Sequence, residues 1–274
     1  MSSSGAFRRL QAWLAWAGLI PLLVIGREVP AQSDADDPAV LEGHNWYLAE
    51  AHTSKGESLP VFTPPNAEPI VLRFHGRSLA VTGCNTLGEG YVLANGRIVQ
   101  SRSEQDLVTR TARGCEARRG MADDAILVLF NGDPRYRLVP PVRRSEGPRL
   151  VLESPADMTV VFRGEPTAEK RFGSKGETIY FDIAPQAIRC ALPGRPVHDC
   201  LQVRQLFEQR DGSYLPDRNE VPAGQAGPWQ LLYDGIEGVN PQEGRESGWY
   251  VGLRRFRREG SETGAPYAYV LFGR

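Results

Sequence analysis

Cysteines and histidines are the side chains of this sequence whose chemistry is easiest to test by spacing. The cysteines are Cys84, Cys115, Cys190 and Cys200, and the histidines are His44, His52, His75 and His198. Nucleophilic catalysis needs a serine or cysteine beside a base. None of the histidines lies in a catalytic motif, and the G-x-S-x-G nucleophile elbow is absent. The sequence therefore favours a protein that is not an enzyme, with a hydrolase as the alternative.

The spacing of the cysteines favours disulfides over metal or redox chemistry. Cys190, His198 and Cys200 do not match a standard zinc pattern, and no C-x-x-C motif is present. Four cysteines allow three connectivities, of which local pairing of Cys84 with Cys115 and of Cys190 with Cys200 is the simplest. Glutamate and aspartate are abundant, but no pair stands out as glycosidase carboxylates. We therefore predict two disulfides, no catalytic residue, no cofactor and no bound metal.

The first 31 residues have the pattern of a signal peptide. Arg8 and Arg9 precede an apolar run over residues 10–26, and Ala31 ends a stretch of small or short residues. An uncleaved membrane anchor is the alternative, since the run approaches the lower length limit for a membrane span. No cysteine follows the apolar run directly, which excludes a lipoprotein. We predict cleavage after Ala31 and a periplasmic mature protein, in which disulfides form readily.

Charge gives no sign of a polyanionic partner. The chain has 274 residues, with 32 basic and 33 acidic side chains and a formal net charge of −1. A near-neutral balance lacks the basic excess typical of proteins that bind nucleic acid or anionic lipid. We therefore expect no nucleic-acid partner and no membrane association after cleavage. The partner is predicted to be an envelope protein or a small ligand, and the protein to be a monomer.

The hydrophobic pattern predicts a mainly β protein of the α+β class. Short strands alternate with turns, and Asn95-Gly96 between two strands is typical of a type I′ hairpin. Apolar residues at helical spacing predict one helix over 116–131, with Gly132 at its end. The predicted organisation is a signal peptide over 1–31, a flexible lead-in over 32–40, a domain over 41–164, a linker over 165–177 and a small all-β domain over 178–274.

Residues of the first domain resemble a known family. Gly83-Cys84-Asn85 follows a strand, Tyr91 comes soon after, and Thr111 precedes Cys115 by four residues. This order is similar to that of the META domain, the family of the heat-shock protein HslJ. The resemblance implies a curved antiparallel sheet packed on one helix, in an envelope protein linked to stress tolerance.

The second domain resembles an uncharacterised domain that is often fused behind META domains. The matching residues are Cys190, Cys200, Trp229, Tyr233, Glu237 and Gly238. Among its aromatic residues, Trp249 and Tyr250 are a possible ligand surface, although aromatic residues in strands more often pack in the core.

Two functions agree with these features. The leading hypothesis is a non-enzymatic periplasmic binding protein that acts in stress tolerance. The alternative is an inhibitor or pilot-like partner that presents a loop or a sheet edge to another envelope protein.

Asn85 is expected to shape its turn, because asparagine side chains hydrogen-bond nearby backbone.

Overall fold

The computed structural model describes residues 38–63, 69–101, 109–112, 114–143, 145–207, 226–241, 248–259 and 265–272. The predicted signal peptide and its cleavage site lie outside the described residues. Within these ranges, none of the helices has the length and apolar character needed to cross a bilayer.

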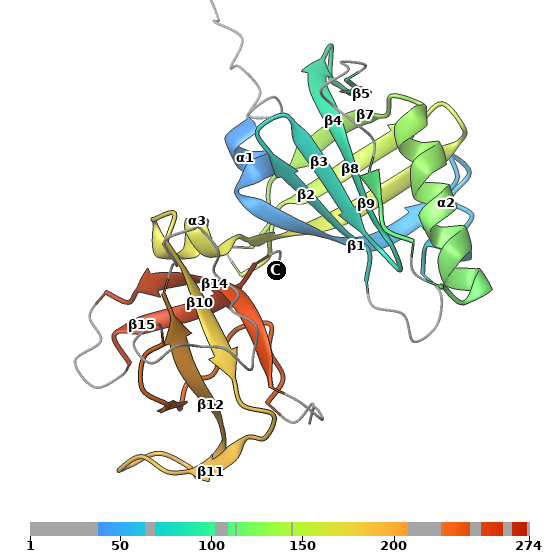
Figure 1. The fold of residues 1–274 in the computed structure, drawn as a ribbon. Helices are drawn as coiled ribbons and strands as arrows, with labels where there is room; N and C mark the ends of the chain where they lie inside the picture. Colours follow the sequence, from blue (N-terminus) through green and yellow to red (C-terminus); the bar gives the residue numbers. More distant parts are fainter. Residues whose placement is uncertain are drawn as a thin grey trace, which may run out of the picture. The chain divides into compact units, whose positions relative to one another are not determined.

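The first sheet is antiparallel and closes into a barrel (Figure 1). Its strands are β1 (His44–His52), β2 (Val71–His75), β3 (Ser78–Thr82), β4 (Thr86–Ala94), β5 (Arg97–Gln100), β6 (Thr109–Arg110), β7 (Arg135–Val139), β8 (Arg149–Ser154) and β9 (Met158–Pro166). The order is β3-β2-β1-β9-β8-β7-β5-β4, and β3 also pairs with β4, which closes eight strands. β6 lies beside β4 at Leu87 and Gly88. The curved sheet expected from the sequence is therefore a closed barrel.

One turn and one helix of the barrel were predicted from the sequence. Asn95 and Gly96 have φ of 53° and 70°, as a type I′ turn between β4 and β5 requires. Helix α2 (Ala117–Asn131) lies where a helix was predicted, and Gly132 follows it. Its buried side chains join the barrel core, whose largest members include Trp46, Phe130 and Phe162.

Two short helices add side chains to the core of the barrel. Helix α1 (Pro38–Glu42) begins inside the range that was predicted as a lead-in, and its Leu41 is fully buried. A 3-10 helix, η2 (Pro60–Phe62), buries Phe62 in the same core and packs against α2.

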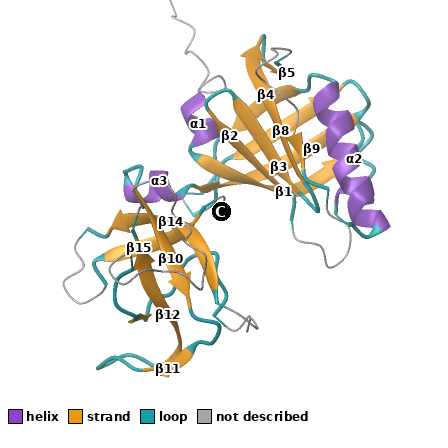
Figure 2. Cartoon of the chain, viewed as in Figure 1, coloured by secondary structure: helices purple, strands orange, loops and turns teal. Residues whose placement is uncertain are grey.

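The second sheet is also antiparallel and has its own core. Its strands are β10 (Glu177–Ile183), β11 (Ile188–Cys190), β12 (His198–Leu206), β13 (Gln230–Leu232), β14 (Trp249–Arg257) and β15 (Tyr267–Leu271). The order is β11-β12-β10-β14-β15, and β13 pairs with β12. Alternate residues such as Phe181, Val203 and Leu253 form the core. Figure 2 shows how strands dominate both parts of the chain, which confirms the mainly β, α+β class.

Helix α3 (Ala168–Phe172) occupies the range predicted as a linker. Thr167 caps it by accepting a hydrogen bond from the Lys170 amide, and Gly173 ends it with φ of 62°. Phe172 stacks on Phe256 with 4.8 Å between ring centroids. The range 165–177 thus holds the end of β9 and a helix whose Phe172 packs on Phe256 of β14.

Candidate functional site

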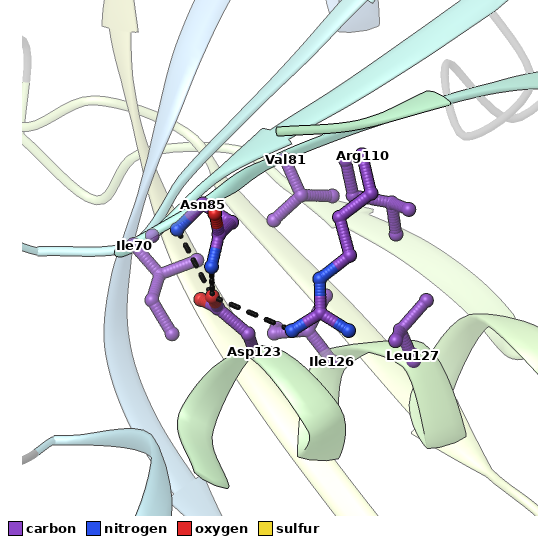
Figure 3. Close-up of a pocket in the computed structure, with 9 residues that line it drawn as sticks. Ile70, Val81, Asn85, Arg110, Asp123, Ile126 and Leu127 are labelled. Carbon is purple, nitrogen blue, oxygen red and sulfur yellow. Dashed lines mark hydrogen bonds and ion pairs between the residues drawn. The ribbon is translucent and has the colours of Figure 1, made fainter. Parts of the chain in front are cut away.

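The turn between β3 and β4 carries the Gly83-Cys84-Asn85 motif and is held by Asp123 of α2 (Figure 3). The backbone N–H groups of Cys84 and Asn85 donate to the two Asp123 carboxylate oxygens at 3.1 and 2.9 Å. The Asn85 side-chain amide donates to the same carboxylate at 3.1 Å. One carboxylate from the helix therefore accepts three hydrogen bonds from the turn.

Glycine is required at position 83 because the helix approaches the turn closely. A Cβ atom on Gly83 would lie 2.5 Å from Oδ1 of Asp123, well inside van der Waals contact. Any other residue would push the carboxylate away from the two backbone donors. The glycine of the motif thus serves the contact between turn and helix.

The second cysteine of this region extends the same network. A disulfide joins Cys84 to Cys115, with 6.1 Å between Cα atoms. The Thr111 hydroxyl donates to Oδ1 of Asn85 at 3.2 Å and accepts from the Thr86 amide at 2.9 Å. These bonds fasten the segment before α2 to the start of β4.

The pocket beside the turn is too small for a ligand. It is lined by apolar side chains and by Asn85, Arg110 and Asp123, as Figure 3 shows. Its volume is about 10 Å³, about what one water molecule needs. Arg110 lies 3.9 Å from the Asp123 carboxylate. We interpret the motif as a structural connection rather than a reaction centre.

Two buried polar side chains of the barrel lie on β4. Tyr91 packs edge-on against Phe74, and burial raises its pKa to about 12. Glu89 is 5 % exposed and accepts a hydrogen bond from the Gln100 amide at 2.6 Å. Burial raises the pKa of the Glu89 carboxyl; this hydrogen bond opposes the shift, and the charge of Asp133 adds to it. Of the predicted motif residues, Tyr91 is thus a core residue.

The second disulfide closes a surface loop. Cys190 ends β11 and lies opposite His198 of β12, and Cys200 lies two residues further along β12. The disulfide joins Cys190 to Cys200 across this hairpin, with 5.9 Å between Cα atoms. Both locally paired disulfides predicted from the sequence are present. Residues 191–197 form the loop that this bond closes.

The closed loop contains a tight turn. The Arg195 amide donates to the Leu192 carbonyl at 3.0 Å, and Gly194 has φ of 75°. Proline in the second and glycine in the third position are typical of a type II turn, and Pro193 and Gly194 take these places. Local sequence alone therefore bends the chain back toward β12.

Side-chain contacts fix the loop to the turn after β13. Arg195 donates to Asp234 at 2.7 Å, and the Tyr233 hydroxyl donates to the Pro196 carbonyl at 2.5 Å. His198 lies edge-on against Tyr233 with 4.1 Å between ring centroids. Arg258 also donates to Asp234, at 2.6 Å. The loop is thus held at both ends and along its middle.

Apolar side chains of this loop face solvent. Leu192 and Val197 have 44 % and 53 % of their surface exposed, and Ile188 on β11 has 42 %. A rigid loop with exposed apolar residues is suited to contact another molecule. These residues were not predicted from the sequence, although Leu-Pro-Gly-Arg between two cysteines indicates a tight turn in a closed loop.

The aromatic residues considered in the sequence divide between core and surface. Trp249 and Tyr250 are both half-buried, and Trp249 packs against the second core. Trp229 is 43 % exposed, with the Arg204 guanidinium 4.8 Å from its ring centroid. The ligand surface suggested for Trp249 and Tyr250 stays a prediction. Trp229 is more exposed than Trp249.

The remaining motif residues lie in the loop that runs beside β15. The Glu237 amide donates to the Tyr269 carbonyl at 2.9 Å, and its carboxylate accepts from Arg171 at 2.6 and 2.8 Å. Gly238 has φ of 92°, which favours glycine. A hollow of about 410 Å³ lies between this loop and Tyr233. Arg171 and Arg258, which line it, are paired with Glu237 and Asp234.

Each of the four histidines lies at an end of a strand. His44 is 5 % exposed, and its Nδ1 lies 2.7 Å from the Val40 carbonyl oxygen. Burial lowers the pKa of His44. His52 and His75 lie at the ends of β1 and β2. Only His198 is placed beside cysteines among the described residues: its ring nitrogen and the sulfurs of Cys190 and Cys200 all lie within 4.8 Å of one another.

Comparisons with known proteins identify no family. Neither the protein-family models nor the curated proteins gave a match. A solved structure described as "NMR structure of the protein from Burkholderia xenovorans" is similar over 47 % of this chain and 88 % of that chain, with 20 % sequence identity and a TM-score of 0.38. This similarity is too weak to support an argument, and the resemblance to the META domain stays a prediction.

Proposed function

We propose that the protein is a non-enzymatic binding protein of the bacterial periplasm that engages another envelope protein through residues 191–197. The disulfide-closed loop carries this proposal. Its turn, its ion pair to Asp234 and the hydrogen bond from Tyr233 hold it in one conformation, and Leu192 and Val197 face solvent. A loop that is ordered before binding loses little conformational entropy on binding, which increases affinity.

A protein partner fits this surface better than a small ligand. Small-molecule sites are concave and enclose most of the ligand, whereas Leu192 and Val197 of the loop are exposed to solvent. The pocket at the Gly83-Cys84-Asn85 turn has room for about one water molecule. The loop therefore favours the alternative function, an inhibitor or pilot-like partner of another envelope protein, over the binding of a small ligand. The two disulfides agree with a place outside the cytoplasm.

Site-specific photo-cross-linking tests the proposal. A photoreactive amino acid replaces Leu192 in one variant and Val128 in a control. Val128 lies on α2 and is also exposed, at 52 %. Irradiation of producing cells is expected to yield a discrete cross-linked product from position 192 and none from position 128. Equal products from both positions, or none from position 192, would contradict the proposal.

A further inference from the structure

We propose that Cys190, His198 and Cys200 form a site of two thiolates and one imidazole that binds Zn²⁺ or a similar ion when the disulfide between the two cysteines is reduced. The three ligand atoms lie within 4.8 Å of one another. In a tetrahedral Zn²⁺ site with bonds of about 2.0–2.3 Å, the ligand atoms lie about 3.3–3.8 Å apart. Sγ of Cys200 already lies 3.9 Å from Nε2 of His198, and opening the disulfide frees the two sulfurs to separate to the distance that a tetrahedral ion requires.

The hairpin itself produces this arrangement. Cys190 and His198 are directly opposite in the β11–β12 register, so their side chains share one face. Cys200 is two residues beyond His198 and projects from the same face, because side chains alternate along a strand. The three ligands are thus placed by backbone pairing, which reduction of a side-chain bond does not remove.

His198 has a hydrogen-bond acceptor for either tautomer of its ring. Its Nε2 lies 2.8 Å from the Tyr233 carbonyl oxygen and 3.9 Å from Sγ of Cys200. Its Nδ1 lies 3.4 Å from the Pro196 carbonyl oxygen. In the disulfide form, Nε2–H donates to Tyr233. In the metal form, Nδ1–H donates to Pro196 and the Nε2 lone pair binds the ion, as metal-bound histidines usually donate from the other nitrogen.

Opening of the Cys190–Cys200 disulfide requires two electrons and two protons, which a dithiol reductant supplies. Its two thiols give two electrons and two protons and become a disulfide, while the Cys190–Cys200 bond opens into two thiols. The ion then replaces the two thiol protons, which pass to solvent, so that both sulfurs bind as thiolates. Reoxidation by a disulfide releases the ion.

The other cysteine pair provides an internal comparison. Cys84, Cys115 and Asp123 also have their ligand atoms within 4.8 Å of one another. Both carboxylate oxygens of Asp123, however, already accept hydrogen bonds from Cys84 and Asn85. That group offers no imidazole and a carboxylate held by its own turn. We therefore assign the metal site to the second disulfide alone.

Metal titration of the purified protein tests the assignment. The probes are Co²⁺, whose thiolate complexes absorb visibly, and Zn²⁺ as competitor. The dithiol-reduced protein is expected to bind one equivalent and the oxidised protein none. His198→Gln keeps a donor for Tyr233 but removes the ligand, and it is expected to weaken binding by at least about tenfold, since even residues that only orient a ligand contribute about 10–100-fold. His75→Gln, a change at an exposed histidine of β2, is the control.

Mass spectrometry locates the bound thiols. Zn²⁺ is expected to protect Cys190 and Cys200 from alkylation, while Cys84 and Cys115 react. No binding by the reduced protein, equal binding by His198→Gln, or protection of Cys84 and Cys115 would each overturn the proposal. Near-ultraviolet circular dichroism follows the fold on reduction. A tertiary signal that is lost on reduction and not restored by Zn²⁺ would overturn it as well.

Discussion

Asp123→Asn is expected to destabilise the barrel much more than its neighbour Asp124→Asn. The Asp123 carboxylate accepts from two backbone N–H groups and one side-chain amide, and the side chain is 9 % exposed. An asparagine amide has one oxygen, so its NH₂ group faces the amide of Cys84 or those of Asn85. The variant tests whether the helix holds the turn.

The magnitude follows from these bonds. An N–H group that loses its acceptor in a buried site costs about 1–3 kcal/mol, and the remaining bonds lose the contribution of the charge, which is about 1 kcal/mol each. The expected loss in the free energy of unfolding is about 3 kcal/mol. For a domain of this size this lowers Tm by roughly 6–12 °C.

The assay is urea and thermal unfolding under non-reducing conditions, with the m-value checked for a change in unfolding cooperativity. Asp124 is the matched control, because its side chain is 68 % exposed and lies 3.5 Å from Arg110. An exposed pair of this kind contributes about 0–1 kcal/mol. If both variants lose the same stability, or if Asp123→Asn loses less than about 0.5 kcal/mol, the account of the turn is wrong.

Further predictions concern the barrel and its disulfide. Gly83→Ala is expected to cost about 1–3 kcal/mol by overpacking, whereas Gly114→Ala, whose Cβ would meet nothing within 4 Å, leaves urea unfolding nearly unchanged; equal effects would contradict the close approach. Replacing Cys84 and Cys115 by alanine removes a link over 31 residues and is expected to cost up to about 3.7 kcal/mol; an unchanged midpoint in calorimetry would show that this bond contributes nothing to stability. The pKa of the Glu89 carboxyl is raised above 4.5 in the folded protein. The stability that protonated Glu89 contributes is therefore fully present below pH 4.5 and is lost as the pH rises through the folded pKa. Glu89→Gln should flatten this part of the plot of unfolding free energy against pH, and a plot identical to that of the parent would exclude Glu89 as the cause.

Local signals allowed many elements to be predicted from the sequence. Asn95-Gly96 marked the hairpin because few residue pairs tolerate positive φ at both positions. The helix over 116–131 followed from apolar spacing. Pairing between distant segments leaves no such signal, so the pairing of β1 with β9 and of β5 with β7, on which the closed barrel depends, was not predicted. The three-residue strand β11 is too short for a recognisable alternation.

The candidate sites were predicted only in part, because only their local features leave a signal in the sequence. Both disulfides were predicted from the order of the cysteines, but the partner of the Gly83-Cys84-Asn85 turn was not. Asp123 precedes the buried Ile126 by three positions and so lies on the buried face of α2. An acidic residue on an apolar helix face was the available signal. Which donors it meets depends on how the helix packs, and this is a property of the folded barrel.

Capture of the partner with variants of the loop tests the central claim most directly. Tagged protein is isolated from its own envelope fraction, and the bound partner is quantified by mass spectrometry. Leu192→Asp with Val197→Asp is compared with Met121→Asp and Val128→Asp, two exposed positions of α2. Loss of a central contact costs about 2 kcal/mol or more, so the loop variant should retain less than about a tenth of the partner and the α2 variant should retain all of it. Equal retention by the two variants would contradict binding through residues 191–197.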